Sequence, residues 1–328
     1  MRLHQLSGPA LVAGTILAVL YVALFAFGSV RHAAGVDELA RTRARIDSLA
    51  AAGAVSTALE RIPELQQTGV PIEPALANPV SVFRCLFAER KHQPTIEALR
   101  KLFVQHVEAA AGLELKGIDL RGAPLRRVSL YRVTFADADL AGADLRETDC
   151  RDANFARAGF EAADVGRARF DRTELRYARF AGADARRTAF VRAVMKGADF
   201  TDAEAAAADF TMAELGFARL VRANLHGAKL TFSSMDGADL REAYLARAVL
   251  RKARMRDANL SGAVLEGAVL VDADLAGAQL QNADLRHADL GGAILTGANL
   301  QGAVLTRSQY ESARTDPETV PPATFLSE

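Results

Sequence analysis

Bulky apolar residues recur at every fifth position through the C-terminal two-thirds of the chain. From Leu115 to Tyr310 there are 40 such central positions without an insertion or deletion, and only Ala185 and Ala205 are small. Alanine usually stands two residues before each centre, Asp or Asn often precedes it, and Gly often follows it by two residues. The pattern predicts that the centre and the alanine face inward while the other three residues face outward.

A period of five residues fits neither an α-helix nor a flat strand. Five residues turn an α-helix by about 500°, which would spread the centres around the helix. On a strand, an odd period would move the centre to the opposite face at every repeat. The chain must therefore turn a corner every five residues, and such a long self-similar array indicates a solenoid.

The runs of Ala-(Asp/Asn)-Leu-x-Gly, such as Ala298-Asn299-Leu300, resemble the pentapeptide repeat proteins over about 200 of the 328 residues. The resemblance implies a mainly β fold, a right-handed quadrilateral β-helix with four five-residue sides per coil. About ten coils at a strand spacing of about 4.8 Å would make a rod roughly 48 Å long.

Residues 20 positions apart should then stack in columns. Phenylalanines fill two opposite columns at the same levels, and the column between them holds small residues: Phe160, Phe180 and Phe200; Phe170, Phe190 and Phe210; Val165, Ala185 and Ala205. A close-packed interior requires such a compensation of volume. Cys150 stands at a centre and is expected to be buried and unpaired.

The N-terminal segment is apolar. No charged side chain occurs between Arg2 and Arg31, and segment 9–30 is long enough to cross a bilayer as a helix. A cleaved signal peptide is the alternative. Arginines follow the segment in greater number than they precede it, which favours a single-pass membrane protein with a cytoplasmic repeat domain, although a periplasmic one stays open.

The remaining organisation follows from helix-breaking residues and apolar spacing. We expect a short tail at 1–8, the transmembrane helix at 9–30, a helical stalk and Pro-rich linker at 31–79, a helical capping segment at 80–112, repeats at 113–310 and a tail at 311–328. Val36–Ile62 and Val80–Glu89 are expected to be helical. The apolar stripe Ile96, Leu99, Phe103 and Val107 should cap the first coil, whereas Tyr310 and Phe325 should cover the last. Thr95–Val107 also loosely resembles the helical lead-in of membrane-anchored bacterial members of the family.

Charge and chemistry exclude several classes of function. Lys+Arg and Asp+Glu are 40 each, so the chain is not a basic nucleic-acid binder. The two cysteines and six histidines are not spaced like the ligands of a metal site. The sequence also contains no phosphate loop and no nucleophile elbow. Asp and Asn before the centres recur as a structural class and are poor catalytic candidates. We therefore expect no enzyme, no catalytic or metal residue and no cofactor.

Two outward surfaces are candidate binding sites. The valine surface has apolar residues where Asp or Asn is usual, on two adjacent walls: Tyr244, Val249, Val264, Val269 and Val304. It suits a protein partner or a dimer, although β-branched residues also suit a strand surface. The arginine surface of the early coils suits an anionic lipid or another acidic partner: Arg126, Arg127, Arg132, Arg151, Arg172 and Arg192. A solvated wall of salt bridges is the alternative. Phe217 and Phe232 point outward without an explanation.

These features favour a non-enzymatic, membrane-anchored scaffold or protein-binding rod of unknown oligomeric state. Some members of the family that the chain resembles mimic DNA and bind type II topoisomerases. Such mimicry needs a strongly negative surface, whereas residues 113–313 contain 28 acids and 28 Lys/Arg. An effector or enzyme with an unidentified site is the third hypothesis.

Overall fold

The computed structural model describes residues 33–38, 40, 41, 44, 60, 63, 69–71, 89–91, 104 and 112–327. The chain divides into two compact units, Met1–Phe103 and Val104–Glu328. In the first unit, strands β1 (Gly69–Pro71) and β2 (Glu89–Lys91) pair antiparallel, with Val70 opposite Arg90. The expectation that Glu89 ends a short helix is wrong, because Glu89 lies in strand β2. A strand of three residues is too short to show a period in the sequence, so the sequence does not predict it.

Several predicted segments fall outside the described residues. These are the tail 1–8, the membrane segment 9–30, most of the stalk and linker 31–79, and most of the capping segment 80–112 with its stripe Ile96, Leu99, Phe103 and Val107. Within the part of the chain that the structure describes, no helix has the length and apolarity needed to cross a bilayer. Residues 33–38 are helical, which includes the expected start of the stalk helix at Val36.

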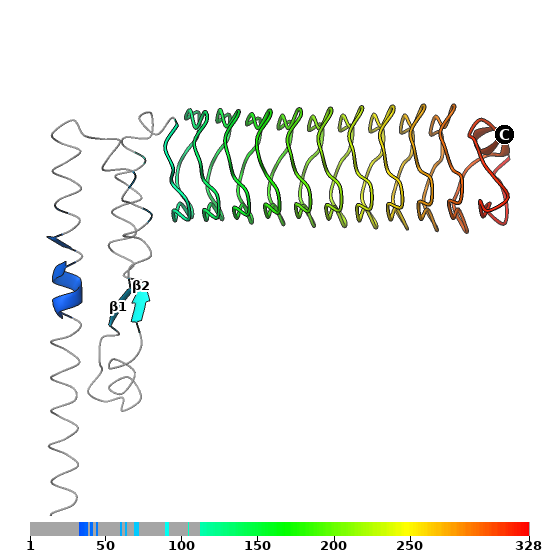
Figure 1. The fold of residues 1–328 in the computed structure, drawn as a ribbon. Helices are drawn as coiled ribbons and strands as arrows, with labels where there is room; N and C mark the ends of the chain where they lie inside the picture. The colour runs from blue at the N-terminus through cyan, green and yellow to red at the C-terminus, as the bar shows by residue number, and fades with distance from the viewer. Residues whose placement is uncertain are drawn as a thin grey trace, which may run out of the picture. The chain divides into compact units, whose positions relative to one another are not determined.

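The second unit is a solenoid whose corners recur every five residues (Figure 1). At each corner the residue two positions after the centre has a positive φ, for example +66° at Gly142 and +61° at Glu147. The next residue donates its backbone N–H to the carbonyl of the centre, as from Ala143 to Leu140 at 3.0 Å. A positive φ in this third position defines a turn that glycine enters without strain. This turn explains the recurrent glycine in the sequence.

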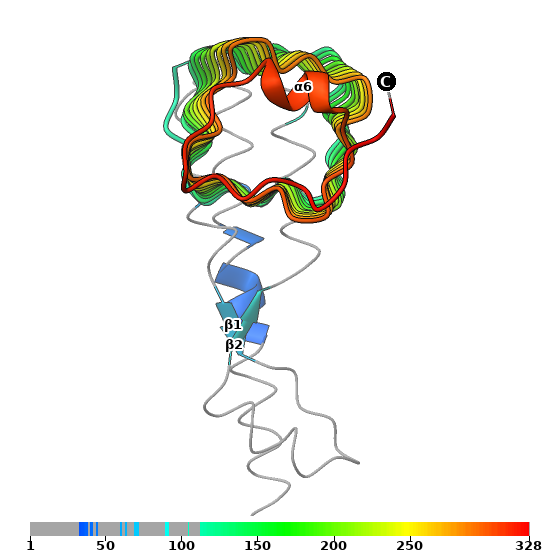
Figure 2. The same cartoon turned by 90° about the vertical axis from the view of Figure 1, so that its right-hand side faces the viewer.

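Parallel bridges join residues 20 positions apart. Thr134 pairs with Asn154, and Asn154 pairs with Glu174, so that the outward residues before the centres form continuous columns. Viewed along the axis, the coils superimpose on a four-sided outline (Figure 2). The predicted β-helix with 20 residues per coil is confirmed.

Stacked aromatic columns fill the middle of the core. Phe160 and Phe180 stack at 4.5 Å, while Phe170 and Phe180 meet edge to face across the axis at 6.2 Å. The rings of both columns and the intervening Ala185 and Ala205 are fully buried. The predicted compensation of volume is therefore confirmed. Cys150 is buried and free, and burial raises the pKa of its thiol.

The C-terminal end of the solenoid is covered by its own tail. Thr306 is the N-cap residue of helix α6 (Arg307–Glu311) and forms a capping box with Gln309. Gln309 Nε2 donates to the carbonyls of Leu285 and Ala288 at 2.8 Å. Tyr310, expected as the last central position of the repeat, therefore lies in a helix, and its ring contacts Phe325 at 5.5 Å. Gln309 thus binds α6 to the preceding coil, whereas the covering of the last coil by the two aromatic rings stays a prediction.

Candidate functional site

The acids that precede the centres stabilise the corners. Asp144 Oδ1 accepts from the backbone N–H of Arg146 at 3.2 Å, and its carboxylate pairs with the Arg146 guanidinium at 2.6 Å. Hydrogen bonds from Arg146 lower the pKa of Asp144. Asn154 and Asn259 accept from the backbone in the same way. The side-chain oxygen of Asp or Asn at this position accepts a hydrogen bond from the backbone N–H two residues later. This structural role explains why Asp and Asn recur there, and no catalytic role is needed.

The valine surface lies on two adjacent walls, as expected. Tyr244 pairs with Val264 and Val249 pairs with Val269, so these residues are neighbours on consecutive coils. Val304 is separated from Val264 by Asp284, whose carboxylate binds Arg286. The four valines are half-buried, and only Tyr244 is exposed. The structure thus brings Tyr244 and the valines together in pairs rather than in one continuous stripe.

A more exposed apolar surface lies on another wall. Here four bulky side chains stand at corner positions with positive φ, where glycine is favoured, and the structure leaves about half of each exposed: Tyr177 (56%), Met212 (43%), Phe217 (64%) and Phe232 (51%). We call these four residues the aromatic wall. Met212 and Phe217 occupy consecutive corners of one coil, on either side of the exposed Glu214. The signal in the sequence is a large apolar residue where the repeat favours glycine.

Neighbouring glycines and cations hold the rings of the aromatic wall. A Cβ atom added to Gly237 would lie 2.7 Å from the Phe217 ring, so the ring covers this glycine on the next coil. Tyr177 covers Gly197 in the same way. Lys196 Nζ lies 5.6 Å from the centre of the Phe217 ring, within the range of a cation–π contact. The wall therefore offers fixed aromatic faces with positive charge beside them.

The arginine surface is divided between two corners and is largely neutralised. Arg126 and Arg127 both bind Glu147, at 2.7 and 2.8 Å, and lower its pKa to about 2. The other four residues lie at the next corner along the chain: Arg132, Arg151, Arg172 and Arg192. Arg151 pairs with Asp149 and Arg172 with Asp152. Arg132 lies over Tyr131, and Arg192 contacts the sulfur of Met212.

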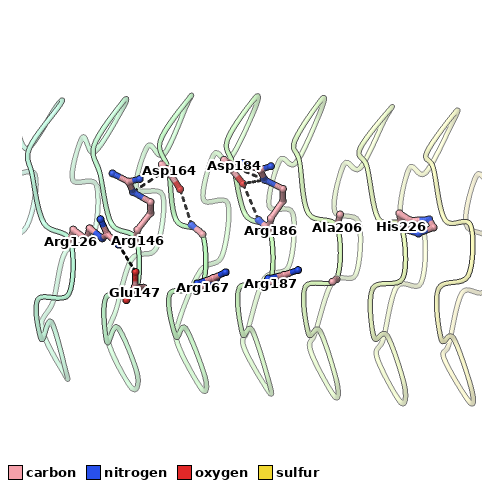
Figure 3. A pocket seen from close by; sticks show the side chains of 12 residues that line it. Arg126, Arg146, Glu147, Asp164, Arg167, Asp184, Arg186, Arg187, Ala206 and His226 are labelled. Atoms are coloured by element: carbon pink, nitrogen blue, oxygen red, sulfur yellow. Dashed lines mark hydrogen bonds and ion pairs between the residues drawn. The ribbon is translucent and has the colours of Figure 1, made fainter.

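A groove of about 680 Å³ runs along the corner that bears Arg126 and Arg127 (Figure 3). It is open because Gly166, Ala206 and Ala207 are short, whereas the corner residues of neighbouring coils are long. Its charged lining consists of Arg126, Arg146, Arg167, Arg186, Arg187, Glu147, Asp164 and Asp184. The groove therefore has more cations than acids.

Within the described residues, no group of three or more His, Cys, Asp or Glu side chains is placed to bind a metal. His226 lines the end of the groove and its ring stacks on Tyr244 at 5.7 Å. Its Nδ1 atom is buried without a hydrogen-bond partner. The chemistry of the groove is that of guanidinium groups.

Comparison with known proteins identifies the repeat. The family model described as pentapeptide repeats matches eight overlapping segments: 114–152, 134–172, 153–190, 173–211, 208–245, 223–262, 253–292 and 273–309. Among curated proteins, no sequence matches the chain.

Solved structures with similar folds include HetL, a pentapeptide repeat protein involved in heterocyst differentiation regulation from the cyanobacterium Nostoc sp. strain PCC 7120. It is 31% identical over 65% of this chain and 91% of its own, with a TM-score of 0.54. QnrB1, a plasmid-mediated fluoroquinolone resistance protein, is 20% identical over 63% of this chain and 89% of its own, with a TM-score of 0.36. The family model covers most of the chain, and the chain belongs to the pentapeptide repeat family.

Proposed function

We propose that this chain is a non-enzymatic, protein-binding rod that its N-terminal segment anchors in a membrane. The observation that carries the binding role is the aromatic wall. Phe217 and Phe232 are the kind of large, rigid side chains that act as anchors in protein interfaces. Both residues have a positive φ, a strained conformation for a bulky residue, so folding alone does not favour them at these corners.

The surroundings of the aromatic wall specify the chemistry of the partner. Glu214, within the wall, has no cationic partner in the described structure. Four cations without an acidic partner there lie around the wall: Arg192, Lys196, Arg251 and Lys252. A partner with apolar groups set among acids would complement this wall. The valine surface, centred on Tyr244 and Val264, is a second candidate for the same role.

Photo-crosslinking with paired variants tests the binding role. A photoreactive amino acid at Glu214, within the aromatic wall, should capture one partner in intact cells. The same substitution at Glu204 is the matched comparison, because Glu204 lies on the opposite wall, in the same column as Tyr244 and Val264. Capture at Glu214 should fall at least tenfold with Phe217→Asp plus Phe232→Asp and persist with Val264→Asp plus Val304→Asp. Capture at Glu204 that is lost with Val264→Asp plus Val304→Asp would move the interface to the valine surface. No capture at either position would contradict the binding role.

The membrane anchor rests on the uncharged segment 9–30. Removing residues 1–30 should move the chain from the membrane fraction to the supernatant while the repeat unit stays folded. A truncated chain that still sediments with membranes would contradict the anchor. A protease added to sealed inverted vesicles should digest the repeat unit if, as the flanking arginines favour, that unit faces the cytoplasm.

DNA mimicry finds no support in the charge of the surface. Many of its acids pair with arginines, as Asp152 does with Arg172 and Asp202 with Arg222, and they do not form an uncompensated negative wall. A gyrase supercoiling assay with the purified chain should therefore show no inhibition. Inhibition would restore the alternative.

A further inference from the structure

The geometry points to a binding site for a phosphate-type dianion in the groove, held by Arg167 and Arg187. The site is separate from the aromatic wall and does not depend on the proposed protein-binding role. Its lining contains five arginines and three acids: Arg126, Arg146, Arg167, Arg186 and Arg187; Glu147, Asp164 and Asp184.

Each acid of the groove is already paired with an arginine other than these two. Arg126 Nη2 lies 2.7 Å from Glu147, and Arg146 Nε lies 3.3 Å from Asp164. Arg186 Nε donates to Asp184 at 2.9 Å. In the described part of the chain, the guanidinium groups of Arg167 and Arg187 are left without a hydrogen bond or an ion pair. Two positive charges therefore remain uncompensated in the same groove.

The surroundings of Arg187 differ from those of the paired corner arginines. Four corner arginines pair with a corner acid one coil away: Arg127 with Glu147, Arg157 with Asp137, Arg172 with Asp152 and Arg222 with Asp202. Arg187 instead has Arg167 on one side and Ala207 on the other. Figure 3 shows the two arginines on neighbouring coils, with their side chains extended in the same direction.

Arg167 and Arg187 stand on neighbouring coils, whose backbones are about 4.8 Å apart, and their like charges repel each other. A bound anion would offset this repulsion. Guanidinium forks match the oxygen geometry of phosphoryl groups and bind them through paired hydrogen bonds. The short side chains of Ala206 and Ala207 leave room beside the arginines for such a group. A volume of about 680 Å³ also accommodates the rest of a small phosphorylated molecule.

Titration of the purified 328-residue chain in nonionic detergent with inorganic pyrophosphate tests the site. We expect one binding event per chain by calorimetry, weakened about tenfold or more in Arg167→Gln plus Arg187→Gln. Arg247→Gln is the matched control, because Arg247 has the same corner position and a positive φ of 58° but has glycines on both neighbouring coils. Binding that survives the double variant, or that Arg247→Gln weakens equally, would overturn the assignment.

A second variant separates binding from folding. Ala207→Glu places an acid one coil from Arg187, as Asp152 stands beside Arg172. The new carboxylate should occupy the place of the anion and abolish pyrophosphate binding, while the melting temperature stays the same or rises. Unchanged pyrophosphate binding in this variant would contradict the site.

Vesicle flotation distinguishes the two sources of a phosphoryl group. Vesicles of phosphatidylcholine with phosphatidic acid are compared with phosphatidylcholine alone. Enrichment on the anionic vesicles that Arg167→Gln plus Arg187→Gln abolishes would assign a lipid headgroup. Binding of pyrophosphate without that enrichment would assign a free phosphorylated molecule, and binding of neither probe would overturn the proposal.

Discussion

At the scale of the residue, the position two after each centre decides how well a corner forms. Its φ is positive throughout the array, yet Arg and Asp often occupy it instead of Gly, and Phe does so at positions 217 and 232. Several of these side chains contact a neighbouring coil: Arg157 binds Asp137, and Tyr177 covers Gly197. Outward side chains at corners therefore act both on stability and on the surface.

Gly197→Ala and Gly182→Ala separate the two contributions to a corner. Both glycines have a positive φ, +67° and +64°, but only at Gly197 would the new Cβ meet a ring, that of Tyr177 at 2.6 Å. Gly182→Ala should destabilise the chain by about 1 kcal/mol. Gly197→Ala should cost about 1 kcal/mol more, because Tyr177 must move. Thermal unfolding measures both, and equal losses would contradict the packing of Tyr177 on Gly197.

The interior offers a second test at this scale. Ala185→Leu should destabilise the chain by about 1–3 kcal/mol, because the facing rings of Phe180 and Phe190 fill the space. The same column contains leucine at positions 225, 245 and 265, so a leucine at position 185 is compatible with the backbone. Adding Phe190→Leu should recover part of the loss. A stable Ala185→Leu chain would show that the core is loosely packed at this level.

At the scale of the element, ion pairs between coils tie the corners together along the rod. Because Arg127 lowers the pKa of Glu147 from 4.5 to about 2, this pair stabilises the fold above pH 4.5. That stabilisation is lost as the pH falls towards 2, where the folded carboxylate is protonated. Hydrogen bonds from Arg172 and Arg222 lower the pKa values of Asp152 and Asp202 and act in the same direction.

The melting temperature should therefore be nearly constant from pH 5 to 7 and fall below about pH 4.5. Glu147→Gln should lower it at pH 7 and reduce the acid-induced decrease. Glu214→Gln is the matched control, since no cation pairs with Glu214 in the described structure. An identical pH profile for the chain with Gln at position 147 would contradict the contribution of this pair.

At the scale of the whole molecule, the sequence predicts the solenoid well and its exposed surfaces poorly. The unbroken period of five fixes every inward residue, which is why the columns of Phe160 and Phe170 could be predicted. Outward residues lack such a constraint, because exposure at a corner depends on what the next coil offers. Phe217 is exposed because it lies over Gly237, and the groove exists because Ala207 follows Arg187. The pairing of β1 with β2 has no periodic signal at all.

Both ends of a solenoid need a cover, and the C-terminal tail supplies one. Leu326 donates its backbone N–H to Leu305 at 2.9 Å, and Val320 pairs with Asn299. Removing residues 306–328 should lower the melting temperature by several degrees and promote association through the exposed last coil. Removing only residues 327–328 is the control. A truncated chain that stays monomeric and equally stable would contradict this role of the tail.

A distance between two spin labels tests the four-sided coil most directly. Cysteines replace the exposed corner residues Arg132 and Lys252, with alanine at Cys85 and Cys150, and the distance is measured by pulsed electron paramagnetic resonance. Six coils of 20 residues separate these positions, which predicts about 29 Å along the axis at about 4.8 Å per coil. A distance near 38 Å, the value for eight three-sided coils of 15 residues, would contradict the fold on which every surface described above depends.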